Sequence, residues 1–89
     1  ATVQVTRAGS RVEVKMLKDL YFLSKPQLKD ILRSLRTGDV VVVDGTNANF
    51  IDHDIYNMLV DFNEVAVAQG IAYELRNIHK NKRSLPRIE

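Results

Sequence analysis

Residues 40–69 read VVVVDGTNANFIDHDIYNMLVDFNEVAVAQ, and the rest of the chain can be placed around them. The four consecutive valines predict a strand that is buried on both faces, because a strand with one wet face would alternate. Turn-forming residues at 44–47 then interrupt the apolar run. The segment that follows carries apolar side chains at helical spacing, namely Ile55, Met58, Leu59, Phe62, Val65 and Ala66. The stretch therefore predicts a central strand, a loop and a long amphipathic helix that Gly70 ends.

The flanking segments complete an α/β pattern. Alternating apolar residues at 2–7 and 11–16 predict a β-hairpin, and the apolar run 20–23 predicts a short third strand. Ser24 and Gln27 have the spacing of a capping box at the start of a first helix, which Gly38 would close as a left-handed cap. The core-facing stripe of this helix is Leu28, Ile31, Leu32 and Leu35. With a last strand at 71–78, the predicted order β-β-β-α-β-α-β is a mixed sheet packed against helices.

Composition indicates one ordinary globular domain, which we place at residues 1–78. The 89 residues include 45% hydrophobic and 27% charged side chains and no cysteine, which excludes disulfides and cysteine-based zinc sites. No apolar run approaches the ~20 residues needed to cross a bilayer. Residues 1–78 carry nine basic and ten acidic side chains, so the domain offers no basic surface for nucleic acid. The net charge of +2 comes from residues 79–89, a basic tail or linker. One interpretation is that this tail contacts an anionic membrane surface.

Three carboxylates stand where the central strand ends and the second helix begins: Asp44, Asp52 and Asp54. Together with Thr46 they could supply oxygen ligands to a divalent cation. We favour a simpler interpretation, in which Asp52 is the N-cap of the helix, Asp54 lies in its first turn and Asp44 begins a turn. His53 between them is a candidate general base, but no serine or cysteine nucleophile lies nearby in the sequence.

Other chemistry finds little support in the sequence. The two acidic residues at the helix start would repel a phosphate, and Asp44-Gly45-Thr46 lacks the second glycine and the lysine of a P-loop. We therefore expect no cofactor and no enzymatic activity. Core packing is the default role of the aromatic residues, Tyr21, Phe22, Tyr56, Phe62 and Tyr73.

The segment 41–46 followed by Phe50-Ile51-Asp52 resembles the central motif of STAS domains. Residues 20–24 resemble the short strand and helix start of the version found in SulP-family anion transporters, and the likeness extends to Tyr73-Glu74-Leu75. STAS domains are the cytoplasmic C-terminal domains of these transporters, or free-standing anti-sigma-factor antagonists. The resemblance implies a STAS-like α/β fold, shortened at the C-terminus because a full STAS domain continues beyond residue 78 with further elements.

The resemblance also implies a function. In the antagonists a serine near the helix start is phosphorylated by a partner kinase, and Asp54 stands at that position here. We therefore expect the domain of a bacterial SulP transporter of sulfate or bicarbonate, at the cytoplasmic face of the inner membrane. Its partners would be the membrane transport domain of the same polypeptide and a second copy. The expected contact or regulatory loop comprises Asp44, Thr46, Asp52, His53 and Asp54. The alternatives are an anti-sigma-factor antagonist and a small metal-dependent enzyme.

Overall fold

The computed structural model describes residues 1–80 and contains one mixed four-stranded sheet. Strands β1 (Val3–Ala8) and β2 (Arg11–Met16) form the predicted antiparallel hairpin. Strands β3 (Val40–Asp44) and β4 (Ala72–Arg76) continue the sheet parallel to β2, in the order β1-β2-β3-β4. The carboxyl ends of β2, β3 and β4 consequently lie at one edge of the sheet.

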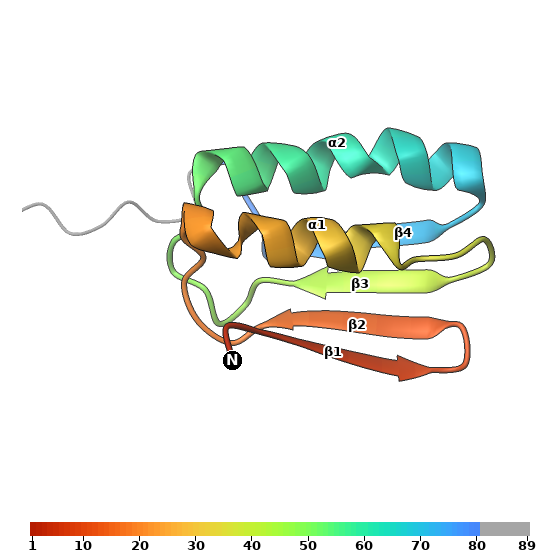
Figure 1. Ribbon diagram of the computed structural model, residues 1–89, viewed down its shortest axis with the longest axis horizontal. Helices are drawn as coiled ribbons and strands as arrows, with labels where there is room; N and C mark the ends of the chain where they lie inside the picture. The colour runs from red at the N-terminus through yellow and green to blue at the C-terminus, as the bar shows by residue number, and fades with distance from the viewer. Residues whose placement is uncertain (81–89) are drawn as a thin grey trace, which may run out of the picture.

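Helices α1 (Lys25–Arg33) and α2 (His53–Gln69) run in the same direction over one face of this sheet (Figure 1). Their apolar stripes pack on the inward-facing side chains of β2 and β3, and the core includes Val14, Val43, Leu28, Leu59 and Ile55. Among residues 1–80, no helix has both the length and the apolar composition that a membrane span requires. The α/β mixed sheet with helices, predicted from the sequence, is confirmed.

The four valines of β3 are not buried on both faces. Val41 and Val43 are buried under the helices, whereas Val40 is 44% exposed on the opposite face. The prediction of a doubly covered strand was wrong because both described helices lie on the same face, so alternate valines face outward. On this open face, neighbours on the flanking strands are charged, as where Val42 lies between Glu13 and Glu74.

The prediction of a third strand at residues 20–23 is also wrong. Of residues 20–23, Leu20 forms one isolated bridge with Ile51, and the 3-10 helix η1 (Phe22–Ser24) follows directly. Ser24 therefore has helical backbone angles, φ −83° and ψ −8°, and its side chain makes no capping hydrogen bond. The capping box fails because an N-cap residue needs an extended backbone, and here the chain already coils before α1 begins.

Helix ends are set differently in α1 and α2. Helix α1 ends at Arg33 with Ser34 as its C-cap, so Gly38, with φ 90°, lies in the turn before β3 rather than in the cap. Helix α2 ends as predicted, with Gly70 in the left-handed conformation at φ 71°. The backbone N–H of Gly38 donates to the carbonyl of Gly70 at 2.9 Å, which joins the two turns at the amino edge of β3.

Candidate functional site

The loop at residues 45–52 connects β3 to α2 at the carboxyl edge of the parallel strands, where the sequence placed the candidate site. Gly45 enters this loop by donating its N–H to the carbonyl of Arg76 at 2.9 Å. A side chain at position 45 would have no room, since an added Cβ would lie 2.7 Å from Cγ1 of Ile78 and 3.0 Å from the carbonyl oxygen of Asn77. Close approach of the β4 end therefore explains the glycine.

Asp44 and Thr46 form one hydrogen-bonded unit with Asn77. The Asp44 carboxylate accepts from the backbone N–H of Thr46 at 2.9 Å and from the Thr46 hydroxyl. These hydrogen bonds from Thr46 are the main reason that the pKa of Asp44 is lowered. The Asn77 amide in turn donates to the Thr46 hydroxyl oxygen at 2.6 Å. Two of the predicted site residues thus hold the start of the loop against the end of β4.

Asp52 acts as the predicted N-cap of α2. Its carboxylate accepts from the backbone N–H of Asp54 at 2.9 Å and of Ile55 at 3.3 Å. Asp54 is exposed in the first turn, where its charge is favourable to the helix dipole. Exposed His53 has its Nε2 3.2 Å from Nδ2 of Asn57, one helical turn further on. The cap interpretation of Asp52 is confirmed.

Sequence reasoning missed Asp19, which holds the far end of the loop. Its carboxylate accepts from the backbone N–H of Asn49 at 2.7 Å and of Phe50 at 3.1 Å. Leu20 then bonds on both sides, donating to the carbonyl of Phe50 and accepting from the N–H of Asp52 at 2.8 Å. In the sequence, Asp19 is visible only as a turn-forming residue before an apolar run, and such a pattern does not identify a contact about thirty positions away.

The carboxylates of this edge are therefore occupied locally rather than gathered. Each carboxylate accepts hydrogen bonds from nearby backbone: Asp44 from Thr46, Asp52 from the first turn of α2, and Asp19 from the loop. Within residues 1–80, no three acidic or histidine side chains are grouped so that they could hold a metal ion. What the loop can offer a partner is a fixed backbone with outward-facing His53 and Asp54.

An exposed apolar turn adjoins this loop, and the sequence did not predict it. Phe22 and Leu23 are 66% and 79% exposed in η1, contrary to the core-packing role expected of Phe22. Tyr21, half exposed, stacks on Phe50 of the loop with ring centroids 5.2 Å apart. Their exposure follows from the 3-10 turn, which replaces the expected strand and directs these side chains outward. We call Tyr21, Phe22 and Leu23 the apolar turn.

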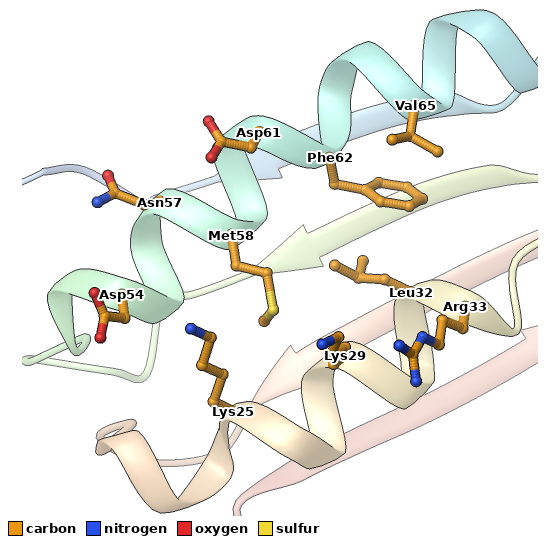
Figure 2. A pocket seen from close by; sticks show the side chains of 10 residues that line it. All are labelled: Lys25, Lys29, Leu32, Arg33, Asp54, Asn57, Met58, Asp61, Phe62 and Val65. Atoms are coloured by element: carbon orange, nitrogen blue, oxygen red, sulfur yellow. The ribbon is translucent and has the colours of Figure 1, made fainter.

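A groove of about 600 Å³ runs between α1 and α2 on their outer side (Figure 2). Basic side chains of α1 line one wall, and polar and acidic side chains of α2 line the other. Apolar side chains from both helices form the floor. The lining residues are Lys25, Lys29 and Arg33 on the α1 wall, Asp54, Asn57 and Asp61 on the α2 wall, and Leu32, Met58, Phe62 and Val65 on the floor.

Crystal structures of a protein named Mglu are similar to this chain. One aligns with a TM-score of 0.70 over 83% of the chain at 26% identity. Another, of Mglu in its native form, aligns with a TM-score of 0.72 over 88% of the chain at 21% identity. The chain spans only 19% and 23% of those proteins, so in them this fold is one part of a longer chain. No protein-family model matches the sequence, and no curated protein matches it.

Proposed function

We propose that this chain is the STAS domain of a bacterial SulP-type secondary transporter of sulfate or bicarbonate. In this proposal it lies at the cytoplasmic face of the inner membrane and carries out no catalysis. The supporting observation is the unit β3–loop–α2, which combines the resembling sequence with Asp52 as cap and an exposed Asp54 at the family's phosphoacceptor position. A carboxylate there gives a permanent negative charge in place of a hydroxyl that a kinase could modify.

The role we propose is mechanical contact with the membrane transport domain of the same polypeptide. The loop is held at its start by Thr46 and at its end by Asp19, so it presents one conformation to a partner. The apolar turn beside it exposes the side chains of Phe22 and Leu23, and complete burial of each in a contact would contribute about 1.5–3 kcal/mol. A fixed polar loop next to exposed apolar side chains suits a docking surface better than a reaction site.

Two further partners belong to this proposal. A second copy of the domain would support dimerisation of the transporter. The basic tail at 79–89 would lie near anionic lipid, with about 1 kcal/mol of attraction per Lys or Arg near the surface. Only His79 and Lys80 of this tail fall within the described residues, and both are exposed.

Anion uptake by the complete gene product is the direct test. Cells that express it should accumulate labelled sulfate or bicarbonate above cells carrying the empty vector. Phe22→Ser with Leu23→Ser should lower uptake or the amount of assembled transporter, because the apolar contact is lost. Val67→Ser on α2 is the matched control, since Val67 is 73% exposed but lies outside the apolar turn and the loop.

Two results would count against the transporter. Uptake of both sulfate and bicarbonate that equals the vector control would exclude the proposed transporter. Stoichiometric phosphate on this chain after incubation with an anti-sigma kinase, measured by intact mass, would favour the antagonist instead.

A further inference from the structure

The groove between α1 and α2 has walls of opposite charge. Lys25, Lys29 and Arg33 are spaced by four residues, so they follow one face of α1 for about 12 Å. Asp54 and Asp61, seven residues apart, follow the facing side of α2. Figure 2 shows the basic and acidic rows on either side of the apolar floor.

Among residues 1–80, no ion pair joins the two walls of the groove. The ion pairs in this part of the chain link Arg7 to Asp39, Arg33 to Asp30 and Arg76 to Glu74. The contact of Arg33 stays within α1 and is 4.0 Å long between exposed groups, which makes it weak. The floor is also incompletely covered, since Val65 is 42% exposed.

We propose that a second copy of this chain docks on the groove, helix layer against helix layer. Because α1 and α2 run in the same direction (Figure 1), a two-fold axis parallel to them would lay α1 of each copy over α2 of the other. The basic row of one copy then faces the acidic row of the second. Lys25 meets Asp54 of the second copy at one end, and Lys29 and Arg33 approach its Asp61. The two apolar floors face each other across the joined grooves.

Charge selects this arrangement over the other face-to-face two-fold. An axis perpendicular to the helices would lay α1 over α1, so that the basic rows oppose each other, and like charges that oppose each other across an interface disfavour association. The parallel axis opposes unlike charges along both walls at once. It also covers apolar side chains that a single copy leaves partly exposed, which supplies the favourable burial term.

The self-association of the 89-residue chain tests this inference without any transport assay. Sedimentation equilibrium should return a dimer at micromolar concentration, and the dimer should weaken as NaCl is raised because salt screens exposed pairs. Lys25→Glu with Lys29→Glu makes the α1 wall mainly acidic and leaves Arg33 as the one basic side chain that lines the groove. Asp54→Lys with Asp61→Lys makes both walls basic. Each variant should dimerise at least about tenfold more weakly than the parent chain.

Mixing the two variants gives the sharpest readout, since the mainly acidic groove of one is complementary in charge to the all-basic groove of the other. The mixture should recover a heterodimer that neither variant forms alone. Arg11→Glu with Lys15→Glu makes the same charge change on the open sheet face and should leave the parent dimer unchanged. Melting curves establish that each variant is folded.

A parent chain that is monomeric at micromolar concentration and low salt would overturn the inference. So would a dimer that both groove variants leave intact, or folded variants that fail to form a heterodimer when mixed. Any of these outcomes leaves the transporter proposal standing, because that proposal is decided by uptake. The inference therefore gives the proposed self-association a surface but can fail by itself.

Discussion

Arg7 and Asp39, 32 positions apart in the sequence, form a two-bonded ion pair at the amino edge of β3. The guanidinium donates to both carboxylate oxygens, at 2.9 and 2.8 Å, and the backbone N–H of Arg36 adds a third hydrogen bond at 2.8 Å. Asp39 is only 4% exposed, whereas Arg7 reaches the surface. The pair joins the β1–β2 hairpin to the turn before β3, so it ties the edge of the sheet to its centre.

This pair should make stability depend on acid pH. The hydrogen bond from Arg7, followed by that from Arg36, lowers the pKa of Asp39 to about 2, against 3.8 for the unperturbed group. Because the folded value is the lower one, the stabilisation is complete above about pH 4 and is lost as pH falls toward 2. The melting temperature of Asp39→Asn should therefore lie below that of the parent at pH 6, and the gap should close by pH 2.

Asp30→Asn is the matched control for this series, because Asp30 is exposed and its single partner lies 4.0 Å away. It should leave the pH profile unchanged. A gap between parent and Asp39→Asn that is as wide at pH 2 as at pH 6 would contradict the prediction.

Removal of the cap of α2 should destabilise the domain modestly. Asp52→Ala deletes the acceptor of two backbone N–H groups and should lower the free energy of unfolding by about 1 kcal/mol. Asp52→Asn, which keeps an acceptor, should recover most of this loss. Urea denaturation measures the three proteins, and equal midpoints for the parent and Asp52→Ala would refute the role of the cap.

Tyr73 should contribute to stability at alkaline pH. Its hydroxyl donates to the carbonyl of Leu59 at 2.6 Å, its ring packs edge-on against Phe62, and burial raises its pKa above the ordinary value of 10. Since the folded value is the higher one, stability is full below pH 10 and falls above it, by up to about 1.4 kcal/mol per pH unit. Tyr73→Phe should cost about 1 kcal/mol at pH 7 and should remove this part of the alkaline loss.

Tyr21→Phe serves as the comparison, because Tyr21 is half exposed. The stability of Tyr21→Phe should equal that of the parent at pH 7 and above pH 10. A parent and a Tyr73→Phe variant that lose stability in parallel above pH 10 would contradict the assignment.

Substitution of Gly45 should strain the junction between the loop and β4. In Gly45→Ala the new methyl group would approach Ile78 and the carbonyl of Asn77, and we expect a loss of about 1–3 kcal/mol. Ile78→Ala removes the closest contact, so Gly45→Ala should cost less in that background. Chemical denaturation of the four proteins gives the coupling, and additive losses would show that the strain arises elsewhere.

Divalent cations should leave the melting temperature unchanged within the error of the measurement. The carboxylates of Asp44 and Asp52 already accept hydrogen bonds within their own segments, and a cation would have to displace these. Titration with magnesium and with calcium at constant ionic strength is the check. A rise of many degrees would restore the metal site that the sequence left as an alternative.

The sequence by itself determined the hairpin, the central strand, the second helix and the positions of Asp52 and Gly70 at its two ends. These features depend on short-range rules, such as apolar period, capping geometry and the freedom of glycine at positive φ, which act within a few residues. The same rules located Asp44 and Thr46 in the loop after β3. They failed at 20–24, where a local preference for strand and cap was overridden by how the chain enters α1.

Only the tertiary structure decided which atoms meet across the chain. The contacts of Asp19 with the loop, of Arg7 with Asp39 and of Tyr73 with Leu59 span 14 to 32 positions. Which face of β3 is covered likewise follows from the placement of both helices on one side of the sheet (Figure 1). The groove with opposite charges arises from the same packing, since each helix taken alone shows only an ordinary solvated face. Such relationships depend on the path of the whole chain, which short sequence patterns do not predict.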